Sequence, residues 1–233
     1  EAALTVGTYG AWLDVSIIAP DTYGISVFGE TTCETLTVYG DVYSTGPKAA
    51  IAGSGNDVNT PTNITIDGGS ASAENYYAIY HPQKGVLTVG NCNIEGRGGI
   101  QMCAGELVIK EKTGIYAQNI GAHGTIDGSD GAIIDGAAVS LVKRSGYGDG
   151  NGPTSVSIEG GSFHSQDGTP IKVYSWNGAE QPGRRPRRAS SAAEVQQRRR
   201  TRLARTGAGV PALRDRPVGR GQRKRIQLLQ LAR

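Results

Sequence analysis

One pattern of apolar and polar positions recurs along the first 178 residues. Segments such as Leu36-Thr37-Val38, Ile64-Thr65-Ile66 and Leu87-Thr88-Val89 place an aliphatic residue at every second position, with Thr between. Alternation with a period of two is typical of β-strands that bury one face. A second apolar stretch accompanies these segments, and its anchors are Ile25, Ile51, Ile79, Ile100, Ile133 and Ile171.

The spacing of these anchors indicates a repeat protein. They lie 26, 28, 21, 33 and 38 positions apart, so the shortest spacing sets a basic repeat of about 21 residues. A strand that recurs at this period buries its apolar face by stacking on its neighbours. We therefore predict a right-handed parallel β-helix, a β-solenoid of about five to six coils, over residues 24–178. Residues 1–23 fit the repeat poorly and are predicted to be an N-terminal cap or a degenerate coil.

An antiparallel β-sandwich is the alternative fold. It explains the alternation equally well, but it does not explain why one strand order recurs with similar turns. The composition fits either all-β fold, because 35 glycines suit many tight turns, while only two Phe and one Met disfavour a helical bundle. No segment approaches the roughly 20 apolar residues of a membrane-spanning helix.

Charge divides the chain at about residue 178. Residues 1–178 hold eight basic and 18 acidic residues, whereas residues 179–233 hold 16 basic and three acidic ones. This Arg-rich tail lacks aromatic residues, so we expect it to be disordered or weakly helical. Three interpretations of the tail stay open: nucleic-acid binding, a flexible basic anchor, and the product of a frameshift in the coding sequence. The arginines that would contact phosphates are Arg184, Arg185, Arg187, Arg188, Arg198, Arg199 and Arg200.

Three segments carry a resemblance to a known group of proteins. They are Ile64–Gly69, Ala78–Gly90 with its Ala-Ile-Tyr-His-Pro-Gln motif, and Gly99–Ile109. Together they resemble the β-solenoid segments of large surface-exposed and phage-associated proteins from gut bacteria, and more distantly the pectate-lyase-like right-handed β-helix class. The resemblance covers about residues 50–175. It implies a structural or adhesive module at a bacterial cell surface or on a virion, and hence an extracellular location.

The expected function is non-catalytic binding, with glycans or surface proteins as partners. Several aromatic side chains fall at strand ends and corners, where exposed rings would suit stacking on sugars. The rings expected to bind such a ligand are Tyr77, Tyr80, Tyr116, Tyr174 and Trp176. The three cysteines match neither a disulfide framework nor a zinc motif and are expected to be buried apolar thiols, so we expect no metal and no cofactor.

A carbohydrate-active enzyme is the alternative function, because parallel β-helices host polysaccharide lyases and glycoside hydrolases. A hydrolase needs two carboxylates beside the scissile bond. Asp127 and Asp130 share one Gly-rich corner, although Asp-Gly is also turn chemistry, and His81 is the general-base candidate. The chain starts at Glu1 and its only Met is Met102, which indicates a removed leader or a fragment.

Overall fold

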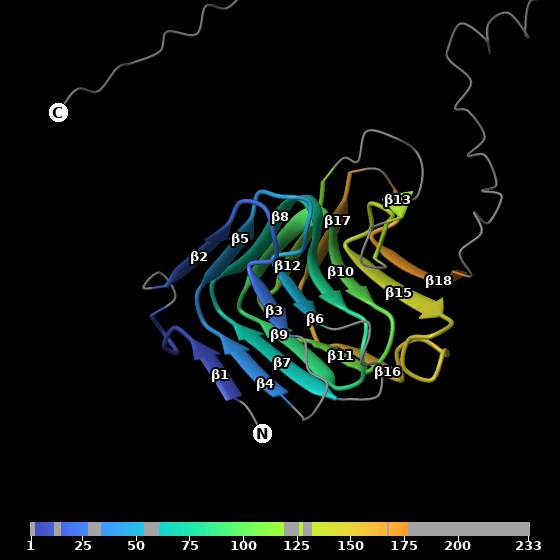
Figure 1. The fold of residues 1–233 in the computed structure, drawn as a ribbon, viewed down its shortest axis with the longest axis horizontal. Coiled ribbons are helices and arrows are strands. Elements are labelled where there is room, and N and C mark those ends of the chain that lie inside the picture. Colours follow the sequence, from blue (N-terminus) through green and yellow to red (C-terminus); the bar gives the residue numbers. More distant parts are fainter. Residues whose placement is uncertain are drawn as a thin grey trace, which may run out of the picture. The chain divides into compact units, whose positions relative to one another are not determined.

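The computed structural model describes residues 3–11, 15–27, 34–53, 61–118, 126–127, 132–166 and 168–176. In these residues the protein is all-β, with no helix, and nearly all strands pair in parallel (Figure 1). The antiparallel contacts are an isolated bridge between Thr8 and Ala11 and the pair of β13 (Ile126–Asp127) with β14 (Ile133–Ile134). The antiparallel β-sandwich is therefore wrong. The predicted tail, residues 179–233, lies outside the described residues.

The strands form three parallel rows. The first row is β1 (Ala3–Val6), β4 (Glu34–Val38), β7 (Thr62–Asp67), β9 (Val86–Gly90), β11 (Glu106–Ile109) and β16 (Ser155–Ile158). The second row is β2 (Ser16–Ala19), β5 (Asp41–Ser44), β8 (Ser70–His81), β10 (Asn93–Met102), β12 (Gly114–Ala117) and β17 (Ser162–Ser165). The third row is β3 (Ile25–Val27), β6 (Ile51–Gly53), the C-terminal parts of β8 and β10, β15 (Val139–Arg144) and β18 (Ile171–Trp176).

The chain visits the three rows in the same order each time. Each repeat thus contributes a strand segment to every row. The long strands β8 and β10 run through the second and third rows, and their pairing shifts register between Gly96 and Gly98. The first two strands, β1 and β2, fall in the region predicted to be a cap or a degenerate coil. They pair in register with β4 and β5, as later strands do with their successors.

The register of the third row tests the predicted anchors. Ile25 pairs with Ile51, Ile51 with Ile79, and Ile79 with Ile100, as expected. The next anchor, Ile133, is wrong. Val139 takes that position between Ile100 and Ile171, because Ile133 lies in β14, which pairs with β13 outside the three rows.

Aliphatic columns fill the space between the rows. In the first row, Leu36, Ile64, Leu87 and Leu107 are successive partners, and each is at most 1 % exposed. Residues from all three rows belong to this one core cluster. The intervening Thr residues, such as Thr37, Thr65 and Thr88, are half-buried and face outward. Stacking thus gives each short strand the burial it could not achieve alone.

Glycine permits the close approach of successive repeats at one corner. Gly85 and Gly105 follow the third row in two consecutive repeats, with φ values of 112° and 75°. A Cβ atom at Gly105 would lie 2.3 Å from the Gly85 carbonyl oxygen, and one at Gly85 would lie 2.1 Å from that of Thr62. Only glycine combines this backbone conformation with this contact.

The buried His81 predicts a loss of stability in acid. Burial lowers the pKa of His81 to about 4, whereas an unfolded histidine titrates near 6.5. The neutral form is therefore favoured in the fold. The stability it contributes is complete above pH 6.5, declines as pH falls from 6.5 to 4, and amounts to about 3 kcal/mol. Urea unfolding of wild type at pH 7.5 and pH 4.5 measures this loss.

Two variants isolate the His81 contribution from that of the carboxyl groups. His81→Gln should flatten the pH dependence between 6.5 and 4, whereas His164→Gln, at an exposed histidine, should leave it unchanged. Equal pH slopes in wild type and His81→Gln would show that His81 is not the group responsible.

Candidate functional site

Most of the rings expected to be exposed are buried. Tyr77 and Tyr80 are 0 % and 1 % exposed, and Trp176 is 6 % exposed, so the prediction that they offer free faces to a ligand is wrong. The reason is that a second apolar cluster packs around them, with contributions from Ala132, Ile134 and other residues. Tyr174 packs against this cluster and is half-buried.

A buried network of hydrogen bonds holds in place the segment with Ala132 and Ile134, which packs against these rings. Asp135 accepts hydrogen bonds from Tyr77 Oη (2.7 Å), Ser140 Oγ (2.8 Å) and the backbone N–H of Ala137 (3.0 Å). Lys172 Nζ donates to the Asp135 backbone oxygen. Burial, and then the charge of Asp135, raise the pKa of Tyr77 well above its usual value. Because Asp135 is only 7 % exposed, the network holds two parts of the chain together and offers no open site.

The residues proposed for catalysis are not brought together in the described residues. His81 is fully buried, so this structure gives it no contact with a substrate. For Asp127 only the backbone is described, and Asp130 lies outside the described residues, as do the seven arginines proposed to bind nucleic acid, Arg184, Arg185, Arg187, Arg188, Arg198, Arg199 and Arg200.

The two described cysteines are buried and free, as the sequence predicted. Burial raises the pKa of Cys92 and that of Cys103 to about 12, so neither is a reactive thiolate. Within the described ranges, no group of three or more His, Cys, Asp or Glu side chains could hold a metal ion. The same ranges contain no helix that could serve as a membrane span.

Tyr116 is the predicted ring that belongs to an open surface. It lies on the outer side of β12, half-buried, and its ring stacks on His164 with 5.0 Å between centroids and 17° between planes. Gln166 Nε2 donates a hydrogen bond to its hydroxyl group. Both neighbours come from the following repeat, so the register positions this aromatic pair.

Tyr116 is one member of an outward column along the second row. Its successive partners, one from each repeat, are Ile18, Tyr43, Ser72, Glu95, Tyr116 and His164. We call the part from Tyr43 to His164 the outer column. The outer column could not be predicted from the sequence. The alternation shows which positions face outward, but the residue types at those positions differ between repeats.

A hollow of about 300 Å³ lies beside the outer column, and we call it the lateral hollow. Its lining residues are Asp41, Tyr43, Ser70, Ser72, Ala73, Glu74, Glu95 and Gln118. Three carboxylates and one aromatic ring therefore come together from three successive repeats. This convergence could not be located from sequence, since the carboxylates are 21 to 54 positions apart.

Hydrogen bonds hold the side chains of the lateral hollow in place. Tyr43 Oη donates to Glu74, Ser70 Oγ to Asp41 Oδ1 (2.7 Å), and Gln118 Nε2 to Glu95 Oε1 (2.9 Å). The hydrogen bond to Glu74 is the main cause that raises the pKa of Tyr43. A carboxylate has about four lone-pair sites, so these groups can still accept hydroxyl or ammonium donors from a ligand.

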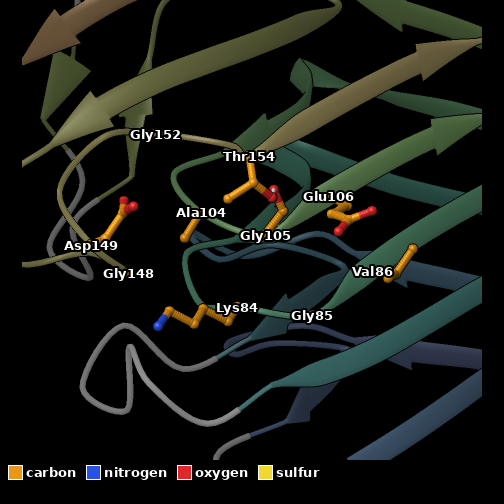
Figure 2. A pocket seen from close by; sticks show the side chains of 10 residues that line it. All are labelled: Lys84, Gly85, Val86, Ala104, Gly105, Glu106, Gly148, Asp149, Gly152 and Thr154. Atoms are coloured by element: carbon orange, nitrogen blue, oxygen red, sulfur yellow. Dashed lines mark hydrogen bonds between the residues drawn. The ribbon is translucent and has the colours of Figure 1, made fainter.

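A second hollow of about 220 Å³ lies at the corner between the third and first rows (Figure 2). Glycine backbone forms much of its lining, and Lys84, Glu106 and Asp149 supply the charges. Thr154 Oγ1 donates to the Gly105 carbonyl oxygen (3.0 Å), and the Asn151 N–H lowers the pKa of Asp149. No aromatic ring is among its described lining residues, so the lateral hollow is the better candidate for ligand binding.

Comparison of the chain with protein-family models, curated proteins and solved structures found no match. A function is therefore inferred mainly from the geometry of the described residues.

The Asp135 network predicts that removal of a single hydroxyl group lowers the free energy of unfolding substantially. Tyr77→Phe removes a hydroxyl that donates to a buried carboxylate, so we expect it to lower the free energy of unfolding by about 1.5–3 kcal/mol. Tyr43→Phe is the matched control, because its hydroxyl also donates to a carboxylate but at an exposed position. Its cost should stay within about 0.5 kcal/mol. Urea unfolding compares the two, and equal costs would contradict a structural role for the network.

Proposed function

We propose that the chain is a parallel β-helix that serves as a non-catalytic, adhesive module and binds a linear saccharide along its second row. The β-helix is supported by the recurring order of three strands and by parallel pairing of each strand with its counterpart one repeat away. The resemblance of residues 50–175 to surface and phage-associated proteins of gut bacteria supports an extracellular location, on a cell surface or a virion.

The observation that carries the binding proposal is the outer column beside the lateral hollow. Adjacent strands lie about 4.8 Å apart, so the four steps from Tyr43 to His164 span about 19 Å. Along this line the ring of Tyr43 is followed by the hydroxyl of Ser72 and the carboxylate of Glu95, and then by the stacked rings of Tyr116 and His164. A ligand that repeats apolar faces and hydroxyl groups along its length matches such a line, and a linear saccharide has this chemistry.

The charge of the lateral hollow narrows the class of saccharide. Among the described residues, Asp41, Glu74 and Glu95 line it, and no basic side chain does. Anionic polymers such as polyuronates would place like charges together at short range. The proposed ligand is therefore a neutral saccharide or one that carries amines.

Ring removal tests the binding proposal. Tyr116→Ala should weaken retention on a neutral or amine-bearing polysaccharide in affinity electrophoresis by about five- to tenfold, because stacked ring contacts contribute roughly 1 kcal/mol beyond buried area. Tyr9→Ala is the control, because Tyr9 is 66 % exposed and lies outside the outer column. Absence of retention on any neutral or amine-bearing polysaccharide would refute the proposal, as would equal effects of the two substitutions.

A glycoside hydrolase is the second candidate function, and the carboxylates of the lateral hollow favour it. Hydrolysis of a glycosidic bond uses a pair of Asp or Glu side chains. If the hollow is catalytic, the protein should release reducing sugars from a retained polysaccharide, and Glu95→Gln should abolish release while retention persists. Retention without release at any pH from 4 to 8 would leave binding as the function.

A further inference from the structure

The hollow of Figure 2, which we call the corner hollow, is lined by charged side chains of both signs. They are Lys84, Glu106 and Asp149, and all three are exposed. Within the described part of the chain, the side chains of Lys84 and Glu106 form no hydrogen bond and no ion pair. The corner hollow therefore presents one ammonium group and one carboxylate that can pair with a ligand, in addition to Asp149.

The loop that carries Asp149 is held in place by hydrogen bonds. It spans residues 145–153, and within it the Asn151 N–H donates to Asp149 Oδ1 (2.9 Å). Directly after the loop, the N–H of Thr154 donates to the Gly105 carbonyl oxygen (2.7 Å), and Thr154 Oγ1 donates to the same oxygen (3.0 Å). These bonds join the end of the loop to the preceding repeat, so Asp149 has a defined position beside the hollow.

Backbone and small apolar side chains form the floor of the corner hollow. A Cβ atom at Gly148 would lie 2.6 Å from the Cβ atom of Ala104, so the loop backbone lies directly on Ala104. Gly85 and Gly105 contribute further backbone, and Val86 contributes an aliphatic side chain. Methylene groups of a ligand can pack on such a floor.

The charged groups lie on two sides of this floor. In Figure 2, Lys84 and Asp149 are on one side of Ala104, and Glu106 is on the other side. The hydrogen bonds from Asn151 lower the pKa of Asp149, and the positive charge of Lys84 lowers it further. Such an effect requires that Lys84 and Asp149 are close to each other. One side thus offers a cation with an anion, and the other side an anion alone.

We propose that the corner hollow binds a diamino acid of the size of lysine. The α-carboxylate of the ligand pairs with Lys84, the adjacent α-ammonium with Asp149, and the second ammonium with Glu106. Its methylene groups lie on Ala104 and Val86. A volume of about 220 Å³ is below the roughly 300–1,000 Å³ of pockets for drug-sized ligands, which suits an amino acid. A ligand with a single charge would leave two of the three side chains without a partner.

The corner hollow shares no lining residue with the lateral hollow, so this proposal does not depend on saccharide binding. It also assigns a different chemistry to the site. Three charges of defined sign recognise the diamino acid, whereas the saccharide is matched by rings and hydroxyl groups.

Three ligands with related aliphatic chains test the role of each charge. Lysine carries all three charged groups, norleucine lacks the second ammonium, and cadaverine lacks the carboxylate. Each is titrated into the isotope-labelled full chain at neutral pH, and the amide chemical shifts are followed by NMR. Exposed ion pairs are weak, so lysine should bind with a Kd of roughly 1–10 mM, and the other two ligands about two- to fivefold more weakly.

Two substitutions connect each ligand group to its residue. Glu106→Gln should weaken the binding of lysine about two- to fivefold and leave that of norleucine unchanged. Lys84→Met should weaken the binding of lysine and norleucine, but not that of cadaverine. Glu111→Gln and Lys110→Met are the matched controls, because these exposed residues lie outside the corner hollow and their substitution should leave lysine binding intact.

Three results would overturn the proposal. The first is the absence of saturable shifts at Gly105 and Gly148 when lysine is added. The second is binding of norleucine or cadaverine that is as tight as that of lysine. The third is equal weakening by the control substitutions, since general attraction between charges would then account for the shifts. Weakening by Glu106→Gln and Lys84→Met that is confined to ligands with the matching group would support the proposal.

Discussion

Parallel pairing in register is the constraint on which the rest of this structure depends. Leu36 pairs with Ile64 and Ile64 with Leu87, so a position that faces the core in one repeat faces it in the next. A slip of one residue would turn all the aliphatic side chains of a strand to solvent. The aliphatic columns therefore fix the register, and the register decides which side chains line up on the outside.

The aromatic rings of the second and third rows differ in how deeply they are buried. On the third row, the segment that contains Ala132 and Ile134 packs with the rings of Tyr77 and Tyr80, which are buried. On the second row, Tyr116 stacks on His164 and is half-buried, and the described residues place no such cluster over it.

The polar side chains of Asp135 and His81 are buried in the interior, and each is accommodated in a different way. Asp135 accepts hydrogen bonds from the hydroxyl groups of Tyr77 and Ser140 and from the backbone N–H of Ala137. His81, which pairs with Met102 in the third row, is kept neutral by burial. A charge without such partners would cost several kcal/mol in this environment. The stability of the stacked repeats therefore depends on the hydrogen bonds of Asp135 and on the neutral form of His81.

The sequence by itself determined the strands, the repeat and most of the register, because the alternation in Leu36–Val38 or Leu87–Val89 depends only on which face is buried. It placed Ile25, Ile51, Ile79 and Ile100 in one line, but it wrongly chose Ile133, because an inserted apolar pair looks like a repeat strand. Only the tertiary structure decided that Tyr77 and Tyr80 are covered and that Asp41, Glu74 and Glu95 share a hollow. Those outcomes depend on contacts between distant repeats, which a local pattern does not encode.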